Sequence, residues 1–195
     1  MVDIIDGGDY GQVEFVSVQA DRVVYVEVDF TDCVFDKCSF YESVFKDCRF
    51  ENCIFKNCEM SGIKVTDSIF VEASFEFCKI IGVDWTTKAT SVFSKLKFSD
   101  SNISYCSFVG LKLMEMETLR CRANDIDFSD CNLSNANFDG TDLAMTRFGN
   151  TNLTGANFSG AFNYAIDPRF NKVKRAVFSM PEAASLLDGF GIVIR

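Results

Sequence analysis

The sequence predicts an all-β solenoid, because large apolar side chains recur at every fifth residue instead of at the helical or simple strand period. Sixteen of the 21 phenylalanines fall on this series, far more than the roughly one in five expected by chance. A second series of small or apolar residues runs two positions ahead of the first. Together they predict short parallel faces, each with two inward side chains, stacked into a rod.

The large inward series falls into two blocks with different registers. The first block is Phe15, Ala20, Tyr25, Phe30, Phe35, Phe40, Phe45, Phe50, Phe55, Met60, Val65, Phe70, Phe75, Ile80 and Trp85. The second block is Phe93, Phe98, Ile103, Phe108, Leu113, Thr118, Ala123, Phe128, Leu133, Phe138, Leu143, Phe148, Leu153 and Phe158. Adjacent coils of such a rod should lie about 4.8 Å apart, with backbone hydrogen bonds along the axis.

All nine cysteines occupy the small inward series. They are Cys33, Cys38, Cys48, Cys53, Cys58, Cys78, Cys106, Cys121 and Cys131. We interpret them as reduced thiols that act as small buried side chains. The alternative, a cysteine nucleophile or a metal site, has no histidine partner anywhere in the chain.

Two interruptions break the period. Trp85 and Phe93 are eight residues apart, which predicts about three extra residues within a register break at 86–92. The break holds a candidate recognition loop with Thr86, Thr87 and Lys88, or simply a corner defect that joins two repeat blocks. The second interruption, 114–120, places Thr118 in a large slot, and here we expect a local kink or bulge.

The two ends lack the repeat. Residues 1–12, with three glycines, predict an irregular or strand-like lead-in. In the segment 164–195, the capping box from Ser179 to Glu182 predicts a short helix that stops at Gly189, followed by a strand over Phe190–Ile194. This segment either caps the solenoid, forms a homodimer interface, or does both. The candidate interface residues are Leu186, Leu187, Phe190, Ile192 and Ile194.

Composition excludes several classes of function. The 195 residues include no histidine, so Ser-His-acid triads and Cys-His dyads are excluded, and we expect neither an enzyme nor a cofactor. No apolar stretch reaches the roughly 18 residues that a membrane span needs, and no signal peptide is evident, so we expect a cytoplasmic protein that does not bind membranes. The net charge of −9 arises mainly in residues 1–60, with 13 acids and 5 bases. Such acidity opposes direct nucleic acid binding.

The segments 136–140 and 151–160 match the pattern small, Asp or Asn, Leu or Phe, polar, polar. Over about residues 13–163 the chain therefore resembles the pentapeptide-repeat family. The resemblance implies a right-handed quadrilateral parallel β-helix with four faces and 20 residues per coil. The period alone does not supply these two numbers.

A narrower resemblance is to the Qnr-type quinolone-resistance and microcin B immunity group. It is carried by Cys121-Arg122-Ala123 with Asp127-Phe128, by the tail 184–194, and by two repeat blocks joined by a break and followed by a helix and a strand. It implies a non-catalytic mimic of DNA that binds a type II topoisomerase, DNA gyrase or topoisomerase IV, and protects it from quinolones or toxins. The long projecting loop of that group is reduced here to 86–92.

Outward acids near the N-terminus would then stand in for phosphates. The candidate partner-binding residues are Asp29, Asp32, Asp36, Glu42, Asp47, Glu51 and Glu59. Their exposure follows from the period, because they flank the inward slots. The alternative is a scaffold with the same rod and acidity that binds a different protein and has no topoisomerase role.

Overall fold

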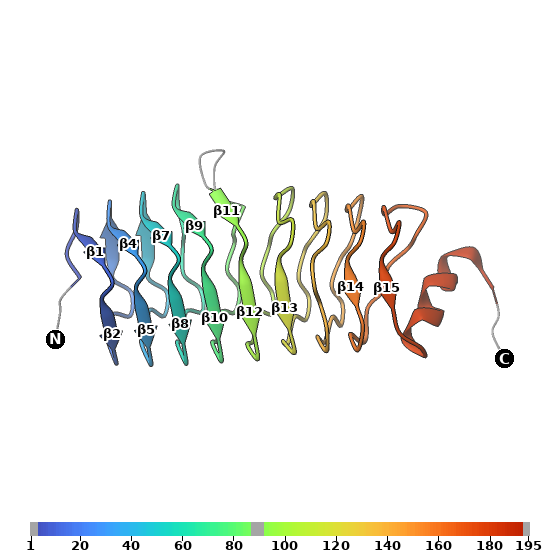
Figure 1. Cartoon of the computed structure of the whole chain (residues 1–195), viewed down its shortest axis with the longest axis horizontal. Helices are drawn as coiled ribbons and strands as arrows, with labels where there is room; N and C mark the ends of the chain where they lie inside the picture. The colour runs from blue at the N-terminus through green and yellow to red at the C-terminus, as the bar shows by residue number, and fades with distance from the viewer. Residues whose placement is uncertain (1–3, 87–91, 193–195) are drawn as a thin grey trace.

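A computed structural model shows the chain as a rod of stacked coils with a short helix at one end (Figure 1). The structure describes residues 4–86 and 92–192. The rod is a right-handed quadrilateral parallel β-helix of about 8 turns, as predicted. Phe15 lies beside Phe35, and Phe35 beside Phe55, so one coil is 20 residues long.

Four sides make up each coil. Side 1 carries β1 (Asp9–Gly11), β4 (Asp29–Thr31), β7 (Arg49–Glu51), β9 (Ile69–Val71) and β11 (Val92–Ser94). Side 2 carries β2 (Glu14–Val16), β5 (Val34–Asp36), β8 (Ile54–Lys56), β10 (Ser74–Glu76), β12 (Lys97–Ser99), β13 (Glu117–Leu119), β14 (Asn157–Phe158) and β15 (Val177–Phe178). Side 3 is held by isolated bridges such as Ser39 to Glu59, and side 4 begins with β3 (Val24–Val26) and β6 (Val44–Lys46).

Aromatic columns fill the axis of the first coils. Phe50 stacks between Phe30 and Phe70 with ring centroids 4.9 and 4.5 Å away. Rings within one coil instead meet edge to face, as Phe30 and Phe35 do at 5.3 Å. Offset stacking along the axis and edge contacts across it are the arrangements that aromatic rings prefer.

The cysteines line the corners of this core as free, buried thiols. Each of several donates to a carbonyl of the preceding coil, as Cys53 Sγ does to Phe30 O at 3.4 Å. Burial raises the pKa of the Cys53 and Cys106 thiols to about 12 and that of Cys131 to about 11. A thiol with so high a pKa is a poor nucleophile and a poor metal ligand, which supports a packing role.

The coil that contains the register break absorbs its extra residues without disturbing the core. Phe75 pairs with Phe98 and Asp84 with Ser107, so this coil has 23 residues instead of 20, as the spacing predicts. Thr87 and Lys88 of the candidate loop lie outside the described residues. The amide of Thr86 donates to Asp84 Oδ1 at 2.9 Å.

The predicted kink at 114–120 is wrong. Thr118 pairs in register with Phe98, and its side chain is fully buried in the large slot. A threonine fills this slot without a change in the backbone, because the backbone is set by the hydrogen bonds to the coils on either side. Its Oγ1 has no hydrogen-bond partner among the described residues.

The C-terminal end also differs from its prediction. The helix η1 is a 3₁₀ helix over Glu182–Phe190, begins after Pro181 without a side-chain cap, and runs through Gly189. It ends at Gly191, which takes the left-handed conformation that favours glycine. Phe190 lies in the helix and Ile192 lies in no strand, so the strand predicted over Phe190–Ile194 is wrong for residues 190–192. Ile194 lies outside the described residues.

Candidate protein-binding surface

The structure distributes the seven candidate acids around the rod. Side 1 and its corners carry Asp29, Asp32, Asp47 and Glu51, whereas side 2 carries Asp36, and side 3 and its corner carry Glu59 and Glu42. Asp29, Asp32, Glu42 and Asp47 are exposed, and the other three are half-buried. The sequence predicts that these seven side chains point outward, but it does not predict that they lie on three different sides of the rod.

Ion pairs within a coil and between adjacent coils neutralise five of these seven acids. Glu42 pairs with Arg22 at 2.8 Å and Glu59 with Lys79 at 2.8 Å, each across one coil. Glu51 lies 2.5 Å from Arg49. Looser contacts join Asp36 to Lys37 at 3.5 Å and Asp47 to Lys46 at 4.0 Å. The hydrogen bond from Arg22 lowers the pKa of the Glu42 carboxyl, so this acid stays charged but compensated.

Uncompensated acids concentrate at the N-terminal end. Within the described part of the chain, seven carboxylates of residues 4–32 make no ion pair: Asp6, Asp9, Glu14, Asp21, Glu27, Asp29 and Asp32. Asp32 instead accepts a hydrogen bond from Asn52 Nδ2. The one base among these residues, Arg22, is held by Glu42. Period analysis locates the acids, but their lack of ion pairs depends on the contacts between coils: Arg49 lies beside Asp29 in the ladder, yet its guanidinium pairs with Glu51.

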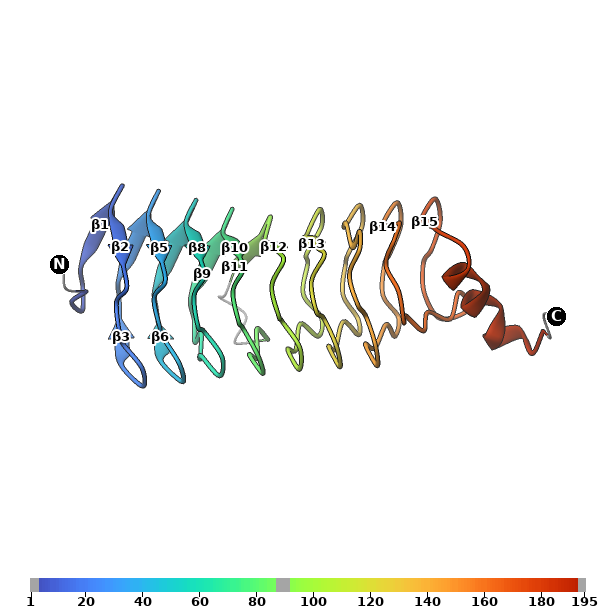
Figure 2. The same cartoon turned by 90° about the horizontal axis from the view of Figure 1, so that it is seen from below.

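Exposed apolar side chains gather at the opposite end. Phe190 and Ile192 are 54% and 51% exposed, and Leu187 is 37% exposed. Leu186 instead packs against the core. Ser185 Oγ lies 3.4 Å from the Tyr164 carbonyl oxygen, so η1 lies over the last coil (Figure 2). Four of the five candidate interface residues are thus placed at one end, three outward and one inward.

Arg169 fastens the helix to the rod. Its guanidinium lies 2.6 Å from Asp167 Oδ2 and over the rings of Phe170 and Phe190, 5.4 and 5.6 Å from their centroids. The hydrogen bond from Arg169 lowers the pKa of the Asp167 carboxyl. The cation–π contact with Phe190 joins η1 to the turn of the last coil that carries Arg169.

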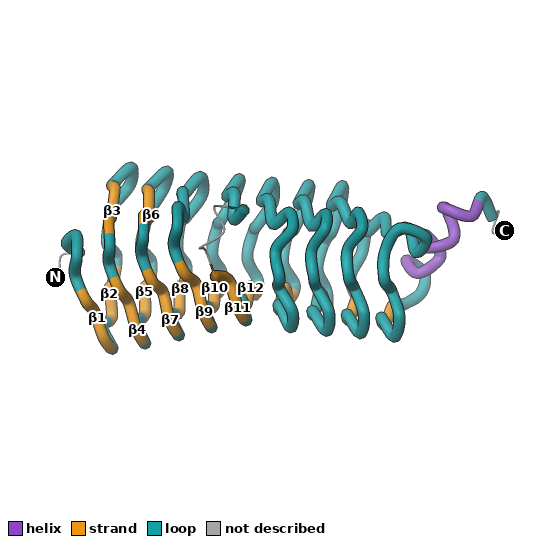
Figure 3. Tube along the Cα trace, turned by 90° about the horizontal axis from the view of Figure 1, so that it is seen from above, coloured by secondary structure: helices purple, strands orange, loops and turns teal. Residues whose placement is uncertain are grey.

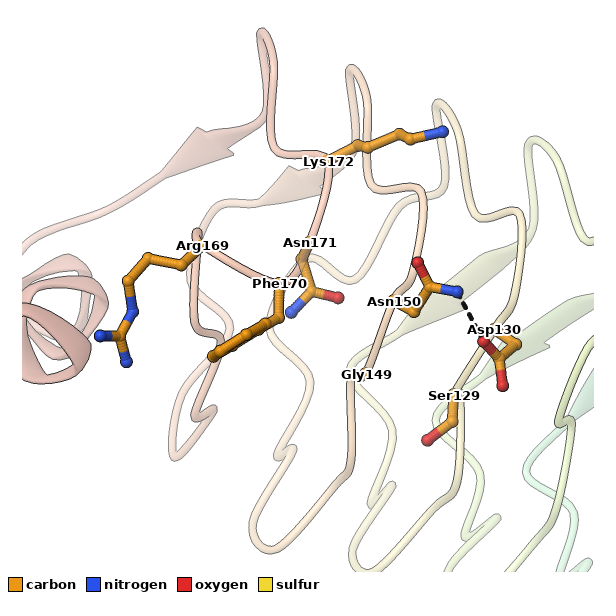
Figure 4. Close-up of a pocket in the computed structure, with 8 residues that line it drawn as sticks. All are labelled: Ser129, Asp130, Gly149, Asn150, Arg169, Phe170, Asn171 and Lys172. Atoms are coloured by element: carbon orange, nitrogen blue, oxygen red, sulfur yellow. Dashed lines mark hydrogen bonds between the residues drawn. The ribbon is translucent and has the colours of Figure 1, made fainter.

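A shallow hollow of about 690 Å³ lies beside this contact (Figure 4). Its lining is Ser129, Asp130, Gly149, Asn150, Arg169, Phe170, Asn171 and Lys172. Asn150 donates to Asp130 Oδ1 at 2.7 Å, and the buried Asn171 is fully bonded to backbone atoms on both sides. Asn150, Asp130, Arg169 and Asn171 are thus already bonded, and within the described residues the Lys172 ammonium and the Ser129 hydroxyl are the lining groups that make no such bond.

Sequence reasoning missed three large exposed side chains at corners of the rod. Phe77, Tyr105 and Met145 are 63%, 63% and 78% exposed and have positive φ of 54°, 64° and 60°. They occupy the position two residues after a large slot, which the period could have identified. Within the described residues, no acidic or sulfur side chains gather into a possible metal site. No helix in that part of the chain is long and apolar enough to cross a membrane.

Comparison with known families then identifies the repeat. A family model described as a pentapeptide repeat region matches residues 28–92 and 89–158. The chain belongs to the pentapeptide-repeat family. No curated protein matches it.

Three solved structures of QnrB1, described as a plasmid-mediated fluoroquinolone resistance protein, share the pentapeptide-repeat fold. A trypsin-treated variant aligns with a TM-score of 0.72 over 96% of this chain and 100% of that one, at 18% identity. A second trypsin-treated variant gives 0.63 over 98% and 93%, and the full-length form 0.50 over 95% and 100%, both at 18% identity. This pentapeptide-repeat chain is thus similar to QnrB1 in fold.

Proposed function

We propose that this protein is a non-catalytic, cytoplasmic mimic of duplex DNA that binds a type II topoisomerase, DNA gyrase or topoisomerase IV. The observation that carries the proposal is the group of uncompensated carboxylates on the first two coils of a rigid rod. A positively charged DNA channel would attract this end and raise the association rate. Such binding would protect the enzyme from quinolones or toxins, and QnrB1, which has the same fold, is a fluoroquinolone resistance protein.

The mimicry would work through the overall field. Coils at about 4.8 Å cannot match the roughly 3.4 Å phosphate spacing of one DNA strand residue by residue. Ion pairs further weaken the field beyond residue 32. We therefore assign the contact to the N-terminal coils, with Asp29 and Asp32 more important than Glu42, Glu51 and Glu59.

A homodimer through the C-terminal end completes the proposal. Leu187 and Phe190 on η1 and Ile192 just after it leave apolar area exposed, and covering it with a second copy would place the two acidic ends at opposite tips. The dimer would be about twice as long as one rod, with its most negative regions furthest apart.

The test is DNA supercoiling by purified gyrase with the protein titrated in, with and without a fluoroquinolone. We expect inhibition of supercoiling or relief of drug-induced cleavage, and loss of that effect in Asp29→Lys/Asp32→Lys. The matched control is Glu115→Lys/Asp139→Lys, which reverses two acids outside ion pairs in the other half of the rod. If gyrase and topoisomerase IV both ignore the protein at micromolar concentration and low salt, the proposal is wrong. The scaffold for a different protein then takes its place.

A further inference from the structure

The two ends of the rod are finished differently. The C-terminal end carries η1 beside the last coil, whereas at the N-terminal end no described helix or strand lies beyond the edge strands β1 and β2 (Figures 1 and 2). Among the strands that the structure describes, β1 pairs with β4 alone and β2 with β5 alone. Side 4 of this end is closed by a turn, because Gly7 N donates to Val26 O at 3.0 Å and Val26 N donates to Asp6 Oδ1 at 2.9 Å. Among residues 4–86 and 92–192, no strand pairs with the outer edge of sides 1 to 3 of the first coil, and we call this edge the open rim.

The 20-residue repeat shows which backbone groups this rim presents. In the second coil, Asp29 N donates to Gly8 O, Val34 N to Val13 O and Ser39 N to Val18 O, all at 2.8–2.9 Å. The residues one coil earlier are Asp9, Glu14 and Gln19. Their N–H groups point the same way along the axis, toward the place where a preceding coil would lie. An edge strand with such groups is a template for another chain.

Charge and side chains around the rim define what would fit. Asp9, Glu14 and Asp21 of the first coil make no ion pair within the described residues. Val16 is 46% exposed at the end of β2. A second copy of this chain would bring like charges together at this end, which opposes such a contact. An extended segment that carries lysine or arginine beside apolar residues complements both features.

We propose that the N-terminal rim binds an extended basic segment of another protein, which adds main-chain hydrogen bonds to β1 and β2. Binding by strand addition takes its affinity from the main chain and its selectivity from side chains that flank the edge. The rim shares the carboxylates of Asp9, Glu14 and Asp21 with the proposed topoisomerase contact, but it differs from that contact in using the main-chain groups of the edge strands.

The test uses the full chain and a fluorescent peptide of about nine residues that alternates lysine and valine. A strand pairs through only one of its two edges, so two versions of the peptide are made, each with N-methyl groups on alternate amides. We expect micromolar binding by anisotropy, loss of binding for one methylated version, and retained binding for the other. We also expect slower hydrogen exchange in residues 9–16 on binding. Equal affinity of the two methylated versions would show simple charge attraction and overturn the proposal.

Variants at Glu14 separate the contribution of its side-chain charge to peptide binding from that of its main-chain N–H. Glu14→Gln keeps the N–H and should weaken binding about threefold, as for one exposed charge. Glu14→Pro also removes the N–H that points away from β5 and should weaken binding about tenfold more, as for one hydrogen bond. Asp188→Asn, an exposed acid on η1, is the control and should leave affinity unchanged. Thermal melts confirm that each variant is folded, and equal affinities for the glutamine and proline variants would also refute the proposal.

Discussion

The N-terminal part of the rod, residues 9–99, and the C-terminal part, residues 101–161, reach the same cross-section by different chemistry. Strands occupy sides 1 and 2 of the first part, and turns replace most of them in the second (Figure 3). The first part stacks phenylalanines, as in the column through Phe50, whereas leucines such as Leu133 fill the same column later. Rings still stack in the second part, as Phe108 and Phe128 do at 5.2 Å, but fewer columns there are aromatic and side-chain hydrogen bonds support the turns.

Asparagine or aspartate before the large slot marks the second part. Asn137 Oδ1 accepts from Asp139 N at 3.1 Å and from Asn157 Nδ2 at 2.9 Å. Asn152 Oδ1 likewise accepts from Thr154 N at 3.2 Å, and Asn152 Nδ2 donates to Asn132 Oδ1 at 2.9 Å. A side chain that accepts the N–H two residues on favours a turn over a strand. The two parts therefore share one coil length, whereas the residue before the large slot decides whether a face forms a strand or a turn.

The largest expected difference lies in the core. Phe50→Ala should lower the free energy of unfolding by about 3–5 kcal/mol, because it removes a ring stacked on both neighbouring coils. Leu133→Ala, at the same slot in the second half and equally buried, should cost less, about 2–3 kcal/mol. Urea unfolding measures both. An equal cost would mean that ring stacking adds nothing to the first half.

Exchanging the residue before the large slot on side 2 tests the second difference. Asn137→Val should cost about 1–2 kcal/mol, because two hydrogen bonds to its oxygen are lost. Ile54→Asn, the reverse change in β8, should cost a similar amount, since a turn-forming side chain replaces a β-branched one in a strand. Thermal unfolding monitors both variants. If either change is neutral, the local rule is wrong for that half.

Two threonines of the second half should respond with opposite signs. Thr118→Val should stabilise the protein by about 1 kcal/mol, because it removes a buried hydroxyl that has no partner among the described residues. Thr141→Val should destabilise it by about 1 kcal/mol, since its Oγ1 donates to Thr118 O at 2.6 Å and accepts from Cys121 N at 3.2 Å. The chemistry of the two substitutions is the same. If differential scanning calorimetry shows that both substitutions stabilise the protein, or that both destabilise it, this account is contradicted.

The smallest expected effect is on alkaline stability. Burial raises the pKa of Cys53 to about 12 from an ordinary 9.0, so the thiol ionises first in the unfolded chain. The contribution of the Cys53 thiol to the free energy of unfolding is fully present below pH 9. It falls as the pH rises from 9 toward about 12. For Cys131 the fall should end near pH 11. Cys53→Ala and Cys131→Ala should each flatten the decline of unfolding free energy above pH 9, and an unchanged decline would show that the thiols contribute nothing.

The sequence alone predicts the inward series, the cysteine positions and the three-residue insertion, because each leaves a mark on a period of five. The kink at Thr118 was a wrong prediction, because a change of side chain in one slot does not alter hydrogen bonds between coils. The helix boundary failed at Gly189, since the end of η1 depends on contacts with the last coil that no local pattern records.

The surface was harder to predict than the core. Outward direction follows from the period, but the pairing of Glu42 with Arg22 joins residues 20 apart and needs the coil length as well. The same holds for the open rim, which depends on what precedes β1 and β2 in space. Some carboxylates pair with a neighbour in their own coil, as Glu51 does with Arg49, but pairs such as Glu42 with Arg22 are a property of two coils.

The axial hydrogen bonds also give the rod directional mechanics. Bonds such as Val34 N to Val13 O and Ile54 N to Cys33 O lie along the axis, one set for each pair of coils. A force that pulls the two tips apart therefore loads these sets in series, so the weakest joint opens first and the chain peels away coil by coil. A load applied across the rod instead presses on filled aromatic layers with almost no compressibility. The molecule is thus stiff when gripped from the side and easily unravelled from its ends.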